Sequence, residues 1–479
     1  MVPAYALAYA RENRPRFIEE LKRFINFPSV SAQPKHASDL RRCAAWLADH
    51  LSRIGLHNAR MIATGHHPLV YADWLQNARG PTLLIYGHYD VQPPEPLNEW
   101  HSPPFSATVR GNNLYGRGAS DDKGQMFAHV KSLEAYLRTC AALPVNVKCI
   151  FEGEEEIGSP NLHSFIERNR GSLSADIAVV SDMPIPGPNR PAITYAMRGG
   201  LSFELEVIGP KRDLHSGLYG GAVHNPLQAL CEIVGTLHDH NGRVTIPGFY
   251  RRVREWKPLE RKHMAKTGPS NIELLQNARA TRAWGETGFT EYERTTIRPA
   301  LTINGIAGGY QGPGTKGVIP ARAVAKLSFR LVPDQDAREL EARLREYIKD
   351  LTPQTVRSRL RVQSHAHPVV FDRNHPAMRA AAFAYRQGFG RAPIFLRCGG
   401  TIPVVDTFRQ TLCIPTVLMG FALPNDNMHA PNEKFYLPNF YKGVTTCIWF
   451  LRALAASQRT RALPQLYEHV ATEEMIASK

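Results

Sequence analysis

The sequence predicts an α/β protein whose mostly parallel central sheet is interrupted by an inserted α+β domain. Three observations support this fold class. Short apolar strands alternate with helical segments early in the chain, strands that alternate apolar and polar residues follow from about residue 200, and the α/β pattern returns near residue 375. We therefore expect an α/β domain formed by 1–199 and 372–479, with an insert at 200–371.

The elements of the first α/β part follow from hydrophobic periodicity. Residues 38–54 and 124–140 carry apolar side chains at helical spacing, which predicts two helices. Short apolar runs at 82–88, 145–152 and 176–182 predict buried strands. Alternation of such strands with helices is typical of a largely parallel sheet.

The insert has a different pattern. Residues 201–209 and 323–333 alternate apolar and polar positions, as half-exposed strands do. Residues 225–239 and 337–351 are predicted to be amphipathic helices. The apolar run at 414–421 then marks the return of the α/β domain.

The composition of the chain is typical of a soluble globular protein. Of 479 residues, 43% are apolar and 21% are charged. No stretch approaches the roughly 18 apolar residues that a membrane helix needs, so no membrane partner is expected. The N-terminus lacks a basic segment followed by an apolar core, and we expect the protein in the cytoplasm. Seven cysteines without a C-x-x-C pair argue against a disulfide scaffold and a zinc ribbon.

The net charge of +15 could favour nucleic acid or steer small anions into a cleft. The basic residues are nevertheless scattered in ones and twos, as at Arg41-Arg42 and Arg251-Arg252. No dense basic stripe with interleaved aromatic residues appears in the sequence. A basic solvated surface is therefore expected, without a nucleic-acid partner.

Residues able to bind metal follow three of the predicted strands directly. His88 and Asp90 follow the first, an acidic run at 152–156 follows the second, and Asp182 follows the third. In open α/β sheets, ligands bind beyond the carboxyl ends of the strands. Imidazole nitrogen and carboxylate oxygen are ligands that zinc accepts. The sequence thus predicts that metal ligands gather at one edge of the sheet.

The adjacent residues Glu154, Glu155 and Glu156 are informative because neighbouring carboxylates repel unless a cation offsets their charge. If one of them binds metal, its neighbour can act as a general base on water.

Each feature also has an ordinary structural explanation. His88 alone could be a core histidine, the DDKG segment at 121–124 could be a turn or helix start, and the acidic run could be a solvated loop. His429 alone, in a loop rich in Pro and Asn, indicates almost nothing. Their occurrence together, in order and at strand ends, favours a functional site.

Eight motifs occur in this order along the chain: SVSAQP, YGHYDVQP, YGRGASDDKG, EGEEEIGS, DLHSGLYGG, VIPARAVAKLSFRLVPDQD, GGTIPV and LPNDNMHAPNEKF. Together they resemble a known family, the di-zinc aminoacylase/carboxypeptidase/dipeptidase family of clan MH, particularly bacterial dipeptidases related to cytosolic carnosinase. The resemblance covers essentially the whole chain. It implies a zinc-peptidase catalytic domain and an insert that serves as lid and dimerisation domain.

The resemblance implies a site with two Zn²⁺ ions, with Mn²⁺ or Co²⁺ as alternatives. One ion would be held by His88 and Asp182, the other by Glu156 and His429, and Asp121 would bridge them. Asp90 would orient His88, fixing its tautomer. Glu155 would be the general base that passes a proton from water to the leaving amine.

The resemblance also implies how substrate is bound. His215 would enter the partner subunit's active site in a homodimer and stabilise the oxyanion there. Arg330 would pair with the terminal carboxylate of the substrate, for which a planar fork is well suited. Gly400 and Thr401 would lie in a glycine-rich loop that contacts the substrate.

Two positions depart from the family pattern: Gly317 stands where Thr or Ser is frequent, and Cys398 where Glu is frequent. Neither is an expected ligand, so the expected activity remains metal-dependent cleavage of dipeptides or short peptides. Removal of an acyl or succinyl group from N-acyl amino acids is the alternative. A more distant alternative is a non-catalytic basic binding protein that retains the fold.

Overall fold

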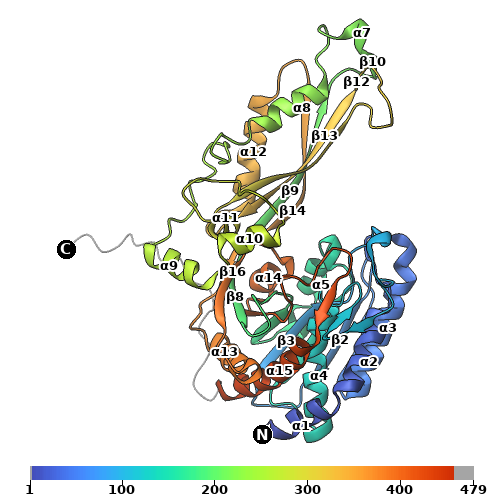
Figure 1. Ribbon diagram of the computed structural model, residues 1–479, viewed down its shortest axis with the longest axis vertical. Coiled ribbons are helices and arrows are strands. Elements are labelled where there is room, and N and C mark those ends of the chain that lie inside the picture. The colour runs from blue at the N-terminus through green and yellow to red at the C-terminus, as the bar shows by residue number, and fades with distance from the viewer. Residues whose placement is uncertain (1–2, 458–479) are drawn as a thin grey trace, which may run out of the picture. The chain divides into compact units, whose positions relative to one another are not determined.

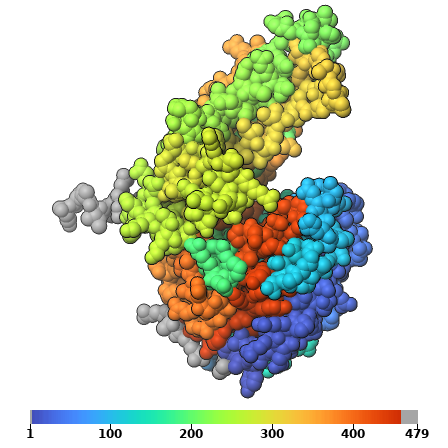
Figure 2. All heavy atoms as spheres, viewed as in Figure 1, coloured from blue at the N-terminus to red at the C-terminus, as the bar shows by residue number. Residues whose placement is uncertain are grey.

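The structure, a computed structural model, describes residues 3–457 and divides into two compact units. The first unit comprises the chain up to Tyr195, Val370–Leu396 and the chain from Pro403 onward, and the second comprises Ala196–Val369 and Arg397–Ile402. In the first unit, segments from the beginning and the end of the chain lie against each other, blue beside red in the space-filling view (Figure 2). Within residues 3–457, no helix combines the length and the apolar character needed to cross a bilayer.

A nine-stranded sheet forms the centre of the first unit (Figure 1). Its strands are β1 (His57–Ile62), β2 (Leu69–Trp74), β3 (Thr82–His88), β6 (Asn146–Glu152), β7 (Ile177–Ser181), β8 (Ala192–Met197), β15 (Val369–Val370), β16 (Ile394–Cys398) and β17 (Thr416–Met419). The four central strands run parallel in the order β6-β3-β7-β17, while β1 pairs with β2, β2 with β6, and β17 with β8 in antiparallel fashion. The predicted α/β class with a largely parallel central sheet is therefore confirmed.

A second, three-stranded sheet contains β4 (Thr108–Arg110), β5 (Asn113–Tyr115) and β18 (Lys434–Tyr436).

Helices cover both faces of the large sheet. The helices of the first unit are α1 (Ala4–Glu12), α2 (Arg14–Ile25), α3 (Ala37–Ile54), α4 (Lys123–Cys140), α5 (Leu162–Arg168), α6 (Arg170–Leu173), α13 (Pro376–Phe389), α14 (Pro403–Thr407) and α15 (Leu437–Ser457). Three short 3₁₀ helices, η1 (Pro34–His36), η2 (Leu97–Glu99) and η3 (Glu155–Ile157), and one short π-helix, η4 (Phe408–Leu412), lie between them. Successive side chains of β3 point to opposite faces: Gly87 lies against α4, and the ring of Tyr86 contacts that of Phe408 in η4. A Cβ at Gly87 would lie 2.7 Å from Cβ of Met126, so glycine permits the close approach of α4.

The register of the central strands aligns their carboxyl ends. His88, the last residue of β3, pairs with Glu152, the last residue of β6. The next parallel strand, β7, ends at Ser181, directly before Asp182. The strand ends therefore bring the predicted metal ligands to one edge of the sheet, as expected for an open α/β sheet.

The second unit contains a four-stranded antiparallel sheet in the order β11-β13-β9-β14. Its elements are β9 (Gly199–Ile208), β10 (Leu214–His215), α7 (Ser216–Tyr219), α8 (Pro226–Gly235), α9 (Pro258–Thr267), α10 (Asn271–Asn277), α11 (Glu291–Thr296), β11 (Ala300–Gly308), β12 (Val318–Ile319), β13 (Arg322–Leu331), α12 (Ala337–Leu351) and β14 (Arg357–Ala366). Strands β10 and β12 form a separate two-stranded sheet.

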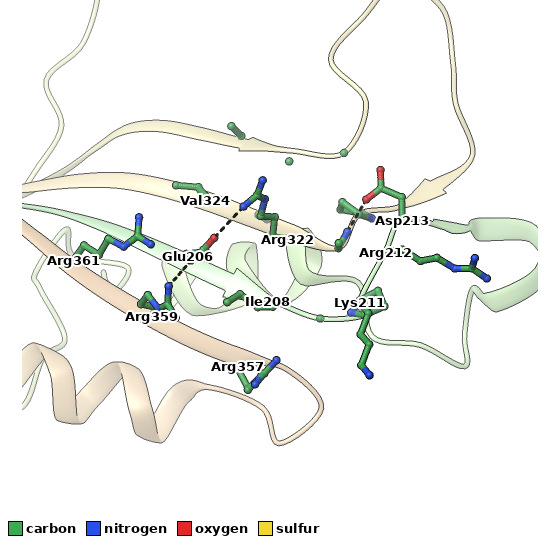
Figure 3. A pocket seen from close by; sticks show the side chains of 18 residues that line it. Glu206, Ile208, Lys211, Arg212, Asp213, Arg322, Val324, Arg357, Arg359 and Arg361 are labelled. Atoms are coloured by element: carbon green, nitrogen blue, oxygen red, sulfur yellow. Dashed lines mark hydrogen bonds and ion pairs between the residues drawn. The ribbon is translucent and has the colours of Figure 1, made fainter.

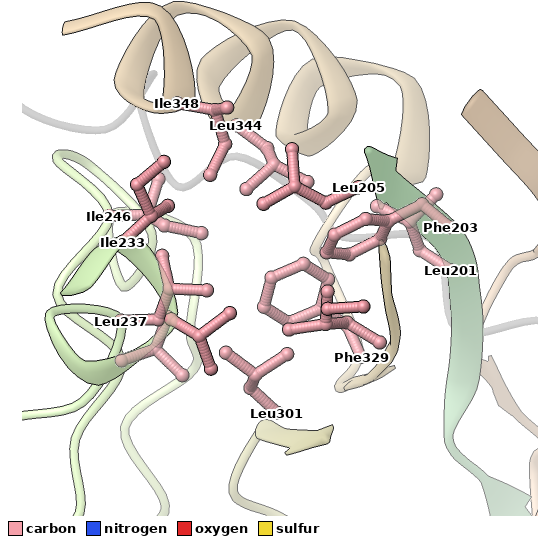
Figure 4. Close-up of a cluster of buried hydrophobic side chains, with 14 of the residues drawn as sticks. Leu201, Phe203, Leu205, Ile233, Leu237, Ile246, Leu301, Phe329, Leu344 and Ile348 are labelled. Atoms are coloured by element: carbon pink, nitrogen blue, oxygen red, sulfur yellow. The ribbon is translucent and has the colours of Figure 1, made fainter. Parts of the chain in front are cut away.

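One face of the four-stranded sheet packs against α8 and α12 (Figure 4). Buried positions alternate along β9, so that Leu201, Phe203 and Leu205 face this core. The ring of Phe203 stacks on that of Phe329 in β13, with centroids 5.5 Å apart. Complete burial of such side chains contributes about 1.5–3 kcal/mol each. The opposite face of the sheet carries the polar positions.

Candidate metal centre

The centre of the candidate site is the carboxylate of Asp121, which faces two histidines with its two oxygens. Nε2 of His88 lies 3.1 Å from Oδ1, and Nε2 of His429 lies 2.8 Å from Oδ2. Asp121 lies in the loop directly before α4, whereas His429 comes from the loop before β18. A carboxylate placed in this way can be shared between two metal ions.

Two further carboxylates complete two groups of potential ligands. Oδ2 of Asp182 lies 3.9 Å from Nε2 of His88, and Oε2 of Glu156 lies 3.3 Å from Nε2 of His429. Within each group of three residues, the ligand atoms all lie within 4.8 Å of one another. The structure thus brings together the five residues for which metal binding was predicted. Their roles as ligands remain a prediction.

The electrostatics of the cluster fit a divalent cation. Within the described residues, the ion pairs of Asp121, Asp182 and Glu156 are all with histidines. Burial, together with the charges of Asp121 and Asp122, raises the pKa of Asp182 well above its usual range. Buried carboxylates that repel one another are stabilised by a nearby cation. The donor set of imidazole nitrogens and carboxylate oxygens is one that Zn²⁺ accepts.

The two histidines are held by different means. His88 is fully buried; burial favours its neutral form, but hydrogen bonds with Asp121 and Asp90 raise its pKa well above the usual range. His429 is half-exposed, and hydrogen bonds with Asp121 and Glu156 raise its pKa to about 10. Its backbone has a φ of 60°, in the left-handed region that non-glycine residues adopt uncommonly. The contacts of Nε2 with Asp121 and Glu156 hold this imidazole in place.

Asp90 connects the two halves of the site. Its backbone carbonyl lies 3.1 Å from Nδ1 of His88, and its Oδ1 lies 3.4 Å from the same nitrogen. Its two carboxylate oxygens accept hydrogen bonds from the backbone N–H groups of Glu155 and Glu156, at 3.2 and 3.1 Å. Because an acceptor at Nδ1 leaves Nε2 free to bind metal, this geometry agrees with the predicted orienting role of Asp90.

The three consecutive glutamates have different environments. Glu154 is buried and points away from the cluster, where it accepts hydrogen bonds from the backbone N–H of His67 and from Nδ2 of Asn161. Burial and the neighbouring carboxylates of Glu156 and Asp121, with His88 opposing them, raise the pKa of Glu155 to about 7. The acidic run is thus not a solvated loop: Glu156 belongs to one of the groups of potential ligands, and the charges of these groups act on Glu155.

Several residues that support the site were not singled out by the sequence. Nε2 of Gln92 donates a hydrogen bond to Oε2 of Glu156, at 2.8 Å. Burial raises the pKa of Asp122 well above its usual range, and its Oδ1 has no hydrogen-bond partner in the structure. The buried carboxylate of Glu433 accepts hydrogen bonds from the loop that carries Asp121. Gln92 and Glu433 lie within the motifs GHYDVQP and PNDNMHAPNE, but their partners cannot be identified from spacing alone.

The predicted substrate-binding residues lie in the second unit and are close to one another. Nη1 of Arg330 donates a hydrogen bond to Oγ1 of Thr401 at 2.9 Å, and that hydroxyl donates to the backbone carbonyl of Arg198 at 2.7 Å. The backbone N–H of Gly400 donates to Sγ of Cys398, at 3.3 Å. The sequence did not single out Arg198, whose Nε also donates to the carbonyl of Gly399. Burial lowers the pKa of Arg198 to about 10.

His215 occupies an exposed position in the second unit, at the end of β10. Its Nδ1 accepts a hydrogen bond from the backbone N–H of Gly217 at 3.0 Å, which caps α7. Its strand partner is Val318, and Gly317 accepts a hydrogen bond from the backbone of the next residue, Ser216. A Cβ at Gly317 would lie 2.8 Å from Oγ of Ser216. Gly317, one of the two departures from the family pattern, therefore lies beside the strand pair that contains His215.

A further group of potential metal ligands, formed by Glu20, His50 and Glu134, has another explanation. The ammonium of Lys131 lies among them, 2.5 Å from Glu20, 2.8 Å from Nε2 of His50 and 2.7 Å from Glu134. A buried lysine supplies the positive charge there, so this group is an ion-pair network.

The sequence profile of peptidase family M20/M25/M40 matches residues 84–452. The chain belongs to this peptidase family. The predicted resemblance is thereby confirmed, and the matched region includes every residue assigned to the candidate metal centre.

Curated relatives cover almost the whole chain. The Beta-Ala-His dipeptidase of Homo sapiens is 31% identical, over 93% of this chain and 92% of its own length. The Cys-Gly metallodipeptidase of Schizosaccharomyces pombe is 30% identical, over 93% of this chain and 97% of its own length.

Solved structures also match almost the whole chain. Human carnosine dipeptidase 1 superimposes with a TM-score of 0.84 at 30% identity, covering 94% of this chain and 98% of its own. The carboxypeptidase Sso-CP2 of Sulfolobus solfataricus has a TM-score of 0.84 at 33% identity, covering 92% of this chain and 99% of its own.

Proposed function

We propose that this chain is a dinuclear metallopeptidase that cleaves dipeptides and other short peptides with a free terminal carboxylate. The observation that carries the proposal is the position of Asp121, whose two oxygens face the imidazoles of His88 and His429. Membership in the peptidase family and the names of its dipeptidase relatives support the same function. Retention of all the predicted ligands argues against a non-catalytic binding protein.

The donor set suggests which residues hold each metal ion. His88 and Asp182 would hold one ion, Glu156 and His429 the other, and Asp121 would bridge the two. When bound, two divalent cations activate a water molecule and polarise the scissile carbonyl. We propose Zn²⁺ as the metal because both nitrogen and oxygen ligands are present, with Mn²⁺ or Co²⁺ as alternatives.

Glu155 would carry the proton during the reaction. Water adds to the carbonyl carbon, forming a C–O bond, and its proton passes to the carboxylate of Glu155. As the C–N bond breaks, the same proton passes to the nitrogen of the leaving amine, which restores the carboxylate. The hydrogen bond from its backbone N–H to Asp90 holds Glu155 next to the metal ligands. The protein thus supplies a base that is positioned by the same residue that orients His88.

The residues proposed to bind the substrate lie in the second unit. Arg330 would pair with the terminal carboxylate of the substrate through its planar fork. Gly400 and Thr401 would contact the substrate, and the hydrogen bond between Thr401 and Arg330 fixes both in relation to each other. We propose that the insert, 200–371 in the sequence-based assignment, acts as lid and dimerisation domain. In a homodimer, His215 would reach the partner's site and stabilise the oxyanion.

We also propose that the protein acts in the cytoplasm. All seven cysteines are free, which agrees with a reducing compartment.

The activity itself is tested by comparing hydrolysis of dipeptides with hydrolysis of N-acyl amino acids by the metal-loaded protein. Cleavage of dipeptides that a chelator abolishes is expected. Activity confined to N-acyl amino acids would instead assign the protein to the deacylases.

A further inference from the structure

A second candidate site lies in the second unit, on the face of the four-stranded sheet opposite the apolar core. A groove of about 800 Å³ opens there over strands β9, β13 and β14 (Figure 3). Six cationic side chains line it and define what we call the arginine groove: Lys211, Arg212, Arg322, Arg357, Arg359 and Arg361. Basic residues that are scattered in the sequence thus gather on one surface.

Strand geometry explains why the arginines share one face. Arg357, Arg359 and Arg361 occupy alternate positions of β14, so their side chains repeat at about 6.6–6.8 Å on the same side of the sheet. Arg322 of β13 and Arg357 both pair with Ile208 of the strand between them. They therefore flank β9 at a separation of about two strand spacings, close to 10 Å.

The positive charge of the groove is only partly compensated. The carboxylate of Glu206 lies between Arg322 and Arg359, at 3.9 and 4.0 Å, distances too long for hydrogen bonds (Figure 3). The other acidic lining residue, Asp213, accepts a hydrogen bond from the backbone N–H of Ala321. Among the described residues, Lys211, Arg212 and Arg357 form no ion pair with a carboxylate. Six cations and two acids give the lining a formal net charge of +4.

The remaining lining residues restrict the class of ligand. They are small or aliphatic, and none of the lining residues is aromatic. Single-stranded nucleic acids need aromatic platforms for their bases, and protein partners anchor in apolar or aromatic pockets. The groove offers neither, but its volume suits a small molecule. Guanidinium groups bind phosphate oxygens through planar, charge-assisted hydrogen bonds.

We propose that the arginine groove binds a small anion that carries several phosphate groups. Arg322 and Arg357 contact the ligand from the two sides of β9, and Lys211 and Arg212 add positive charge at the same end of the groove. None of the residues that line the groove is assigned to peptide hydrolysis, and the proposal does not depend on the proposed peptidase activity.

The test is a calorimetric titration of the metal-loaded protein with inorganic triphosphate. The groove variant carries Arg322→Gln and Arg357→Gln. The matched control carries Arg251→Gln and Arg252→Gln, which removes the same charge from arginines that pair with Glu339 elsewhere in the second unit. Triphosphate also chelates divalent metal. The contribution of the groove is therefore the difference in triphosphate affinity between the two variants, compared at equal metal content.

We expect the wild type and the control to bind triphosphate alike and the groove variant to bind at least about tenfold more weakly. Binding should weaken as ionic strength rises. Equal affinity in both variants would overturn the proposal. The proposal would also be overturned if an oligomer of D-glutamate bound more tightly than triphosphate. That result would indicate an acidic peptide as the ligand. Sedimentation of both variants measures the mass of the assembly. If the mass changes in the groove variant while its affinity for triphosphate does not, this face is a contact between copies of the chain and the proposal is overturned.

Discussion

The carboxylate of Glu433 accepts hydrogen bonds from the backbone N–H groups of Ser120 and Asp121, which precede it by 313 and 312 residues. The distances are 2.9 and 3.1 Å, and the N–H of Gly118 and Nη1 of Arg117 donate to the same carboxylate, both at 2.8 Å. Glu433 is fully buried. It therefore fixes the backbone of the loop that presents Asp121 to the two histidines.

Replacement of Glu433 by Gln should weaken metal binding. An amide places N–H donors opposite backbone N–H donors, so the loop loses at least one hydrogen bond and Asp121 is no longer held in place. Loss of such a supporting residue typically lowers metal affinity about 10- to 100-fold. The metal dissociation constant, measured by competition with a chromogenic chelator, tests this prediction.

Asp73→Asn is the matched control for Glu433. Asp73 is also a buried carboxylate, but it accepts hydrogen bonds from Asn58 and Tyr71. Its replacement should lower the melting temperature and leave the metal dissociation constant unchanged. If both variants lose metal affinity equally, the effect is one of general destabilisation and not of positioning.

Glu155→Gln should lower turnover by about two to four orders of magnitude while the metal content stays the same. The substitution removes the proposed base, whose contribution is typically about 10²- to 10⁴-fold, but none of the proposed ligands. Glu156→Gln is the neighbouring comparison and should lose metal. Steady-state kinetics together with elemental analysis distinguish the two. Near-normal kcat in Glu155→Gln would reject its role as the base.

Arg330→Lys should raise KM for dipeptides with a free carboxylate about tenfold to hundredfold, because the ammonium cannot form two parallel hydrogen bonds. The same variant should cleave dipeptide amides as the wild type does, since these lack the carboxylate. The ratio of kcat/KM for each dipeptide and its amide is the measurement. An equal loss on both substrates would indicate that Arg330 acts only on the structure of the loop at Thr401.

His215→Ala and Glu155→Gln subunits should complement each other if His215 completes the partner's site. Each variant alone is expected to be nearly inactive. A mixed dimer contains one site with both residues intact, so mixing should restore up to about a quarter of the wild-type turnover when subunits exchange at random. Absence of any recovery after verified exchange would place His215 in the site of its own chain or outside catalysis.

Acid stability should depend on His50. Burial and the ammonium of Lys131 lower the pKa of His50 from 6.5 to about 3, while Glu134 opposes this shift. Between these values the unfolded chain binds a proton that the folded protein does not. The contribution of His50 to stability is therefore present above pH 6.5 and is lost as the pH falls toward 3, by at most about 1.4 kcal/mol per unit.

His50→Gln keeps an acceptor for Lys131 and removes the titration. Its free energy of unfolding should fall less steeply than that of the wild type over this pH range, and urea titrations at matched metal content measure both. Because Glu20, Glu134 and Arg16 remain in both proteins, the difference between the two curves reports His50 alone. Parallel curves would contradict the assignment.

Much of the fold could be predicted because local patterns determine it. The apolar run at 82–88 is β3, and the amphipathic segment at 337–351 is α12, each with the predicted bounds. The order of strands and helices also predicted that His88, the acidic run and Asp182 gather at one edge of the sheet. These features depend on periodicity and on the parallel arrangement, which short segments of sequence contain.

Other features depend on contacts between distant residues and could not be predicted from the sequence. Glu154 looks equivalent to its two neighbours in the sequence, yet its carboxylate accepts hydrogen bonds from the backbone N–H of His67 and from the side chain of Asn161. The role of Glu433 depends on a loop more than 300 residues earlier in the chain. The arginine groove arises because strand pairing brings Arg322 and Arg357 to the two sides of Ile208.

The most direct test of the central proposal is a titration of the metal-free protein with zinc while dipeptide hydrolysis is followed. If Asp121 bridges two ions, activity should rise to a plateau at two equivalents per chain, and a chelator should abolish it. In Asp121→Asn, tight binding of the second equivalent should be lost together with activity. Hydrolysis that persists in the chelated protein, or a plateau at one equivalent that Asp121→Asn leaves unchanged, would contradict the account.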